Sequence, residues 1–214
     1  MDIISIVAGP VETNGYLIID KTSAKCCTID VPPESSERYL SEINNRSLDL
    51  DSIILTHTHW DHAAEAGKMH ELTKAPIYVH EDDEYRLKDP MNNTILPLPF
   101  TIEPIAADIY LRHGEKINCG KITFEIRHTP GHTEGGVCLI DHDNRLVFAG
   151  DTLFFGSVGR VDLPGGSGRQ LIESIERELM SLPDDYKVYS GHGPTTTIGE
   201  ERKNNPFLNG ESIF

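Results

Sequence analysis

The segment THTHWDHAAEAG at residues 56–67 constrains the fold and chemistry of this chain more than any other. It follows the apolar run SIIL and places His57, His59, Asp61 and His62 within six positions. In a helix, side chains at i and i+2 point about 200° apart, whereas an extended chain sends them to the same side. We therefore expect His57 and His59 to follow a strand in extended chain and to face one common ligand.

The density of candidate ligands in this segment predicts two metal ions. Four candidates in six residues are too many for one four-coordinate zinc that also takes ligands from elsewhere in the chain. Burying such a cluster without a metal is also costly. Two neighbouring divalent ions account for the cluster better than one.

Three later motifs supply further candidate ligands. His132 lies in EIRHTPGHT, Asp151 in LVFAGDT and His192 in KVYSGHG. Each follows an apolar run and a turn that contains glycine, and in layered α/β folds sites collect at the carboxyl ends of strands. A single motif of this kind is weak, but all of them in this order after HxHxDH predict one shared metal site.

Periodicity indicates an α/β layered architecture. Short β-branched or apolar runs end in Gly, Asp, His or Pro, which is typical of strands that run into loops. Helical patterns occur at about 34–45, 63–73, 81–88 and 168–181, the last with a stripe of Leu171, Ile175, Leu179 and Leu182. Strands mixed with helices favour layers, and 214 residues suit a single domain spanning 1–214.

Several residues near the motifs carry weaker predictions. The Pro- and Asn-rich segment Asp89–Pro104 is the best candidate for a mobile loop over the site. Trp60, Phe154 and Phe155 are expected in the wall of the site or in the core, with the core favoured for the two phenylalanines. Of the five histidines that are not candidate ligands, His128 is the one expected to support a ligand.

Composition excludes some partners and locations. A net charge of −15 offers no basic surface for nucleic acid or an anionic membrane. No apolar run is long enough to span a membrane, and the N-terminus lacks the apolar core of a signal peptide. The four cysteines show no C-x-x-C spacing, so we expect reduced thiols in a cytoplasmic protein.

HxHxDH at 57–62, His132, Asp151 and His192 resemble the metallo-β-lactamase superfamily, over nearly the whole chain. The resemblance implies a four-layer αββα sandwich with metals at one edge of two sheets. It implies that His57, His59 and His132 hold one ion, that Asp61, His62 and His192 hold the other, and that Asp151 bridges them. Zinc is the expected ion, with iron or manganese as alternatives.

Within that superfamily, THTHWDHAAEAG, TPGHTEGG, FAGDTLFFGSVGRVDLPGG and SGHGPTTTIGEERKNNPF look most similar to glyoxalase II, the hydroxyacylglutathione hydrolase. The resemblance implies hydrolysis of a small-molecule thioester such as S-D-lactoylglutathione by a metal-bridging hydroxide, with Asp61 orienting the nucleophile. Arg160 is expected to pair with a substrate carboxylate or, equally, to form a surface salt bridge.

The end of the chain resembles the short relatives of glyoxalase II. The tail GEERKNNPFLNGESIF predicts one short helix at most, so we expect no C-terminal helical domain, which supplies much of the glutathione site in the full-length enzymes. GSVGRVDLPGG also departs from the full-length pattern around its Gly-Arg pair. Both features leave the thiol half of the substrate open.

An oxygenase is the main alternative. Persulfide dioxygenases share the scaffold and a similar Gly-Arg-x-Asp run, here Gly159, Arg160 and Asp162, and hold a single iron by the equivalents of His57, His132 and Asp151. True β-lactamases fit less well, because they generally lack the complete ligand set. A non-catalytic, metal-bound scaffold would require that set to be retained for stability alone.

Overall fold

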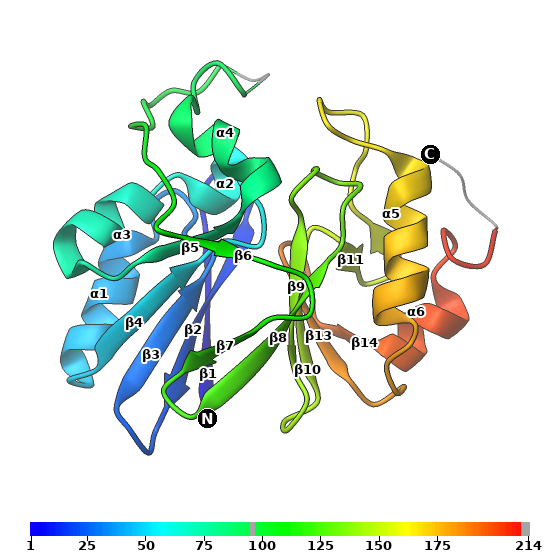
Figure 1. Cartoon of the computed structure of the whole chain (residues 1–214), viewed down its shortest axis with the longest axis horizontal. Helices are drawn as coiled ribbons and strands as arrows, with labels where there is room; N and C mark the ends of the chain where they lie inside the picture. The colour runs from blue at the N-terminus through cyan, green and yellow to red at the C-terminus, as the bar shows by residue number, and fades with distance from the viewer. Residues whose placement is uncertain (95–96, 211–214) are drawn as a thin grey trace.

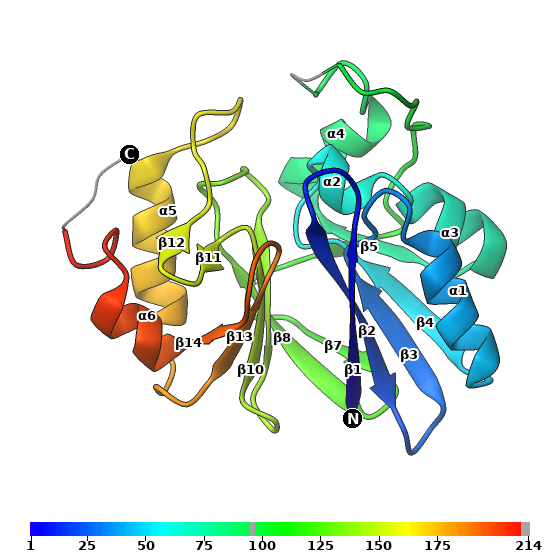
Figure 2. The ribbon, with the colours of Figure 1, turned by 180° about the vertical axis from the view of Figure 1, so that it is seen from behind.

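Two six-stranded sheets face each other and carry helices on their outer sides (Figures 1 and 2). The structure is a computed structural model that describes residues 1–94 and 97–210. The order of layers is helices, sheet, sheet, helices, as expected for a four-layer αββα sandwich.

The first sheet has the strand order β1-β2-β3-β4-β5-β6. β1 to β3 are antiparallel, and β3 to β6 are parallel. Parallel strands end at the same edge, so the loops after β3, β4 and β5 emerge together. The strands are β1 (Asp2–Ala8), β2 (Thr13–Asp20), β3 (Lys25–Ile29), β4 (Asp49–Ile54), β5 (Ile77–His80) and β6 (Ile109–Leu111).

The second sheet has the order β14-β13-β10-β9-β8-β7, with β10 and β13 parallel and the other pairs antiparallel. A separate ribbon of β11 and β12 follows β10 in the chain. The strands are β7 (Lys116–Cys119), β8 (Ile122–His128), β9 (Val137–Asp141), β10 (Leu146–Gly150), β11 (Leu153–Phe154), β12 (Ser157–Val158), β13 (Lys187–Ser190) and β14 (Thr196–Thr197).

The helices divide between the two outer faces, with α1 to α4 beside the first sheet and α5 and α6 beside the second (Figure 1). α5 continues into a π-helical stretch, η2, and a 3₁₀ turn, η1, precedes α4. The bounds are α1 (Ser36–Asn45), α2 (Trp60–Ala63), α3 (Ala66–Thr73), η1 (Glu81–Asp83), α4 (Glu84–Lys88), α5 (Gly168–Ser174), η2 (Ile175–Leu179) and α6 (Ile198–Asn204).

Three apolar clusters lie between the four layers. Along β2, Leu17 packs in the cluster under the helices of the first sheet, whereas its neighbour Ile18 packs with Phe124 and Phe148 between the sheets. This follows from the two-residue period of a strand, and it explains why β2 is buried along its whole length. Each fully buried side chain of this size contributes about 1.5–3 kcal/mol. The third cluster fills the space between the second sheet and α5.

The stripe predicted on residues 168–181 is confirmed. Leu171, Ile175, Leu179 and Leu182 all belong to the third cluster. The segment is not a uniform α-helix, however, because its second half is π-helical from Ile175 to Leu179. Both forms bury the same apolar face, so hydrophobic periodicity does not distinguish them.

The other expected helices occur with small shifts of their ends. The segment predicted at 63–73 corresponds to α3 (Ala66–Thr73), and α2 (Trp60–Ala63) overlaps it only at Ala63. Nine apolar runs of the sequence all became strands, namely IISIVAG, YLIID, CCTID, SIILT, PIYVH, ITFEIRHT, GVCLID, RLVFAG and KVYSG. Five strands were not anticipated, namely β6, β7, β11, β12 and β14, which have two to four residues each. Four of these strands have two or three residues, too few to display an alternating pattern, and β7 (KINC) alternates over only four residues.

All four cysteines are buried and unpaired. Cys26 packs under the helices of the first sheet and its neighbour Cys27 packs between the sheets. Burial raises the pKa of the Cys26 thiol to about 12 and that of Cys138 to about 11. These thiols act as small apolar side chains.

Candidate metal centre

The loop after β4 carries four candidate ligands in two different conformations. Residues 55–59 form neither helix nor strand, and the backbone of His59 is extended (φ −61°, ψ 149°). The ring centroids of His57 and His59 lie 4.9 Å apart, as expected for alternate residues of an extended chain. Asp61 and His62 follow in the short helix α2.

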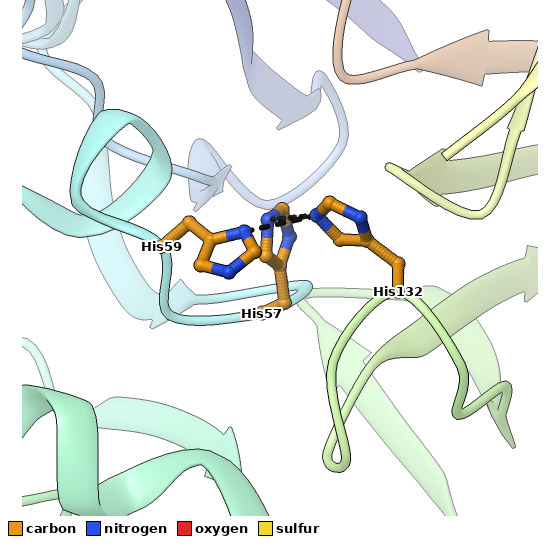
Figure 3. A group of neighbouring side chains, drawn as sticks. All are labelled: His57, His59 and His132. Carbon is orange, nitrogen blue, oxygen red and sulfur yellow. Dashed lines mark hydrogen bonds between the residues drawn. The ribbon is translucent and has the colours of Figure 1, made fainter. Parts of the chain in front are cut away.

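His57, His59 and His132 form the first ligand group (Figure 3). His132 comes from the loop after β8 in the second sheet, so the group joins the two sheets. His132 Nε2 lies 2.9 Å from His59 Nδ1 and 3.3 Å from His57 Nε2. The three imidazoles turn their nitrogens toward one another, as the sequence predicts.

Asp61, His62 and His192 form the second ligand group. His192 follows β13, so this group also joins the sheets. His192 Nε2 lies 3.2 Å from Asp61 Oδ2 and 3.4 Å from His62 Nε2. His62 Nε2 lies 3.5 Å from Asp61 Oδ2.

Asp151, directly after β10, lies between the two groups. Its Oδ1 is 3.2 Å from His62 Nε2 in the second group, and its Oδ2 is 3.5 Å from His132 Nε2 in the first. The next residue after β13, Gly191, has no room for a side chain, because a Cβ there would lie 2.2 Å from Asp151 Oδ1 and 2.6 Å from His62 Cε1. The glycine lets the backbone pass this close to the ligands.

The donor set fits a divalent ion in each group. Two imidazole nitrogens bound to one tetrahedral zinc at about 2.0–2.1 Å are roughly 3.3 Å apart. The Nε2 atoms are separated by 3.3 Å in the pair His57–His132 and by 3.4 Å in the pair His62–His192. Asp151 Oδ1 is buried and accepts no well-formed hydrogen bond from the described residues. A cation would satisfy these converging lone pairs.

The outer nitrogens of four rings are held by hydrogen bonds, which fixes the direction of each ring. His57 Nδ1 contacts Thr56 Oγ1 at 3.2 Å, and His62 Nδ1 contacts Asp30 Oδ2 at 2.7 Å. His132 Nδ1 donates to the carbonyl of Arg160 at 2.7 Å, and His192 Nδ1 donates to that of Val11 at 3.1 Å. With Nδ1 occupied, Nε2 of each ring faces the centre.

Sequence reasoning missed Asp30, which connects both groups. This buried carboxylate accepts hydrogen bonds from the Thr56 backbone and hydroxyl, each at 2.8 Å, as well as contacting His62. Thr56 in turn contacts His57. Asp30 has a left-handed backbone, φ 60°, which Asp tolerates better than most residues. The available signal was the Asp that ends the apolar run CCTID.

Burial keeps imidazoles of the first group neutral. It lowers the pKa of His57 well below its ordinary value and that of His59 to about 3, and neighbouring imidazoles add to both shifts. Both rings are therefore unprotonated at pH 7, which is the form that binds metal.

Carboxylates reverse this effect in the second group. Burial opposes protonation of His62, but Asp151, Asp30 and Asp61 together raise its pKa above the ordinary value. The pKa of His192 is also raised, because its hydrogen bond to Asp61 and the charge of Asp151 exceed the effect of burial. Burial favours the neutral form of Asp61 and Asp151, yet the neighbouring His62 lowers both their pKa values.

A cavity of about 490 Å³ opens onto both groups. The floor contains Asp151 and ligands of each group, and the loop predicted over the site contributes the wall at Asn92, Asn93 and Thr94. The described parts of Asp89–Pro104 contain no helix or strand, whereas Ile95 and Leu96 lie outside the described residues. The position of this loop agrees with the prediction, and its mobility stays a prediction.

The aromatic residues near the motifs differ from expectation. Trp60 lines the cavity, backed by Phe100 with ring centroids 6.1 Å apart. The core positions favoured for Phe154 and Phe155 are wrong: Phe154 takes the alternative place in the cavity wall, beside His192, and Phe155 is 55% exposed. The reason is the ribbon of β11 and β12, whose tight turn holds Phe155 away from any packed layer.

Arg160 lines the cavity and forms a salt bridge at its rim. Its guanidinium donates two hydrogen bonds of 2.8 Å to the Asp162 carboxylate, and both side chains are more than half exposed. The salt bridge predicted as one alternative is therefore present. A role as substrate anchor is compatible with it, since an exposed pair of this kind contributes only about 0–1 kcal/mol.

His128 contacts no predicted ligand among the described residues. It donates from Nε2 to the Glu134 carbonyl at 2.9 Å, in the loop that carries His132, and stacks on His80 with centroids 3.9 Å apart at 11°. His80, Asp82 and His128 lie close enough to be considered for a metal. Nearly parallel rings, however, direct their in-plane lone pairs side by side rather than at one ion.

Comparison with known proteins identifies the family. The model of the metallo-beta-lactamase superfamily matches residues 10–192. The chain belongs to this superfamily. The match covers every ligand candidate described above, and the superfamily consists of proteins that bind divalent metals, in agreement with the His and Asp groups found here.

Individual relatives extend over nearly the whole chain. It is 36% identical over 204 residues to the hydroxyacylglutathione hydrolase GloC of Haemophilus influenzae, covering 94% of this chain and 95% of that protein. A crystal structure of the BLEG-1 B3 metallo-beta-lactamase has a TM-score of 0.89 at 33% identity, covering 97% and 99% of the two chains. A crystal structure of TTHA1623 in a di-iron-bound form has a TM-score of 0.78 at 34% identity, covering 96% and 100%.

The comparisons confirm the four-layer α/β fold and the superfamily predicted from the motifs. They assign the chain to metallo-hydrolases without fixing the substrate. Among the described residues no helix has the length and apolar character required to cross a membrane.

Proposed function

We propose that this chain is a binuclear metal-dependent hydrolase of thioesters, similar to glyoxalase II. The observation that carries the proposal is the position of Asp151 between two ligand groups at the floor of one cavity. The similarity to a hydroxyacylglutathione hydrolase adds support. We propose zinc as the first choice of ion, although the related di-iron structure makes iron a close alternative.

Two bound divalent ions would supply a hydroxide near neutral pH and polarise the substrate carbonyl. The residues of the chain hold and orient the reactants around them. Asp61 is positioned to accept a hydrogen bond from the attacking water, because its carboxylate is fixed by Thr13 Oγ1 at 3.1 Å and has a lowered pKa. Hydroxide adds to the carbonyl carbon, the C–S bond breaks, and the thiolate leaves without help from a protonated acid.

The cavity fits a small molecule with one anionic group. Its volume lies within the range of about 300–1,000 Å³ that is typical of ligand pockets. Apart from imidazoles, two cationic side chains of the described part of the chain line it, Arg86 and Arg160. Arg86 is buried and bonded to Asp83, Glu134 and a carbonyl. Arg160 is exposed at the rim, so we propose it as the partner of a substrate carboxylate.

The alternative is an oxygenase with a single iron. His132 lies 3.3 Å from His57 and 3.5 Å from Asp151, so these three residues could form the two-histidine, one-carboxylate site of such enzymes. The second group is complete, however, and an enzyme with one ion would leave its inward-facing donors unused. We therefore favour the hydrolase.

The deciding experiment combines activity and metal content on one sample. The protein, purified without added metal, is assayed with a series of acyl-thiol substrates and with glutathione persulfide under oxygen electrode recording. Two ions per chain with thiol release support the proposal. One iron per chain with oxygen uptake and no thiol release overturns it in favour of the oxygenase.

Arg160→Met tests the substrate anchor. We expect KM to rise roughly 3- to 10-fold for substrates that carry a carboxylate and to stay constant for neutral acyl-thiols. Arg145→Met is the matched control, because Arg145 forms a similarly exposed salt bridge with Asp185 outside the cavity. If KM changes equally for charged and neutral substrates, Arg160 does not bind the substrate carboxylate.

A further inference from the structure

A buried ion pair lies behind the metal centre, between Asp83 at the end of η1 and Arg86 in α4. Arg86 Nη1 donates to Asp83 Oδ1 at 2.9 Å, and the side chains are 4% and 0% exposed. Buried ion pairs give little net stability, because the loss of hydration offsets the attraction. The position of this pair therefore calls for another explanation.

The Asp83 carboxylate joins the two loops that carry the first ligand group. From one loop it receives the backbone N–H of Thr58 at 3.1 Å, and Thr58 lies between His57 and His59. From the other loop it receives the hydroxyl of Thr133 at 2.9 Å, directly after His132. One side chain is thus bonded next to all three members of the group.

Two further contacts hold the same junction. The Asp83 carbonyl accepts the Thr58 hydroxyl at 2.7 Å, and Asp83 Oδ1 accepts the backbone N–H of Gly135 at 2.7 Å. Gly135 is required for this approach, since a Cβ there would lie 2.7–2.8 Å from atoms of Asp83. The carboxylate therefore uses both oxygens on the ligand loops.

Arg86 fixes the orientation of Asp83 and extends the connection. Its Nη2 donates to Glu134 Oε2 at 2.6 Å and to the Pro164 carbonyl at 3.1 Å. Pro164 belongs to the segment after Arg160, whose carbonyl holds the His132 ring. The guanidinium thus braces the loop of His132 from two sides.

We propose that Asp83, held by Arg86, is a positioning residue that sets the spacing of His57, His59 and His132. Asp83 itself does not line the cavity. The second group takes its support from Asp30 and the Val11 carbonyl instead, so Asp83 acts selectively on the first group. The inference rests on the proposed metal centre but not on the choice of substrate.

Thr133→Val and Asp83→Asn test the role with Co²⁺ as the probe. Thr133→Val removes one hydrogen bond to Asp83 at nearly constant volume, and it decides the question if Asp83→Asn does not fold. We expect the affinity of the first group for Co²⁺, measured by chelator competition, to fall about 10- to 100-fold in Asp83→Asn and less in Thr133→Val. The visible ligand-field bands of that ion should shift in both, while the second ion is retained.

Arg127→Met is the matched control. Arg127 is a half-buried arginine in a salt-bridge network with Glu125 and Glu178, on the outer side of the second sheet. The Arg127→Met variant should have a lower melting temperature than wild type and an unchanged affinity and spectrum for Co²⁺. If Thr133→Val and Asp83→Asn also change only the melting temperature, the positioning role is wrong. If wild-type protein binds no Co²⁺ in a histidine environment, the metal centre itself is wrong.

Discussion

The two ligand groups are built from the same two sides of the molecule, yet they differ in charge. The first group contains three imidazoles, and burial lowers the pKa of two of them, His57 and His59. The second contains the carboxylate of Asp61, and the surrounding acids raise the pKa of His62 and His192. In the first group, His57 and His59 are unprotonated before an ion binds. In the second group, a metal ion must displace the protons that the acids hold on His62 and His192.

The hydrogen-bond partners that hold the ligand rings from behind also differ in charge between the two groups. A hydroxyl and a carbonyl hold His57 and His132 in the first group. A buried carboxylate, Asp30, holds His62 in the second. A carboxylate partner makes an imidazole a stronger donor. The difference teaches that neighbouring sites are tuned by the group that holds the outer nitrogen of each ring, and four sets of variants test this.

Asp151→Asn should have the largest effect, because this residue lies between both groups. The amide keeps the size of the side chain but removes its charge. We expect kcat to fall by more than about 100-fold, beyond the 10- to 100-fold typical of supporting residues. Metal analysis should show the loss of at least one ion per chain.

Asp185→Asn is the control for Asp151→Asn, because Asp185 is an exposed acid that forms a salt bridge with Arg145 away from the cavity. It should keep both ions and full activity. Wild-type metal content in Asp151→Asn would contradict the bridging position of Asp151.

His59→Ala and His192→Ala remove one ligand from each group. We expect each variant to keep one ion per chain and to lose activity by about 10- to 100-fold or more, since a ligand matters at least as much as its support. The Co²⁺ spectra should differ, because His192→Ala keeps a site of three imidazoles and His59→Ala keeps the site that contains Asp61. If either variant loses both ions, the two groups do not act as separate sites.

Asp30→Asn compares the supports directly with Thr56→Val. Asn tolerates the left-handed backbone at this position, so the substitution adds no strain. We expect the second group to bind metal about 10- to 100-fold more weakly in Asp30→Asn. Thr56→Val removes the contact of the hydroxyl with His57 and also its hydrogen bond to Asp30. Because the contact with the His57 ring is between neutral groups, the first group should weaken only about 5-fold. Chelator competition measures the affinity of each ligand group for its ion separately. If both variants lose the same affinity, Asp30 and Thr56 do not differ in the way proposed.

His80→Phe should have the smallest effect and should leave both groups occupied. Burial, together with the stacked His128, lowers the pKa of His80, so the folded state prefers the neutral ring. That preference contributes fully to stability above pH of about 6.5, the pKa of an unfolded histidine, and is lost as the pH falls toward the folded value.

The measurement for His80→Phe is the free energy of unfolding between pH 8 and 5, with chelator present in all samples. Wild type should lose more stability than His80→Phe as the pH falls. The hydrogen bond from the Asp82 backbone to His80 is also lost, but this gives a constant offset. Parallel curves for the two proteins would show that His80 does not titrate in this way.

The sequence predicted the fold and the ligand candidates because both depend on local patterns. HxHxDH and the glycine turns before Asp151 and His192 mark strand ends, where the layered fold brings side chains together. The nine apolar runs that became strands are long enough to show their burial. In each case the residue type and its immediate neighbours carry the information.

The supports were missed because they depend on contacts between distant segments. Asp30 and His62 are 32 residues apart, and Asp83 reaches Gly135 across 52 residues. No local pattern distinguishes these acids from the many solvated ones in a chain with 34 acidic residues. Phe155 was misplaced for a related reason, since its apolar side chain lies in a two-residue turn that no sequence period reveals.

Both ligand groups draw members from opposite halves of the sandwich, so neither group exists until the halves dock. An ion bound there would connect the two halves, because it binds the docked form and not the separated one. Its contribution to resistance against unfolding would then grow with the logarithm of the free ion concentration. Removing free metal would therefore lower the free energy of unfolding together with the activity.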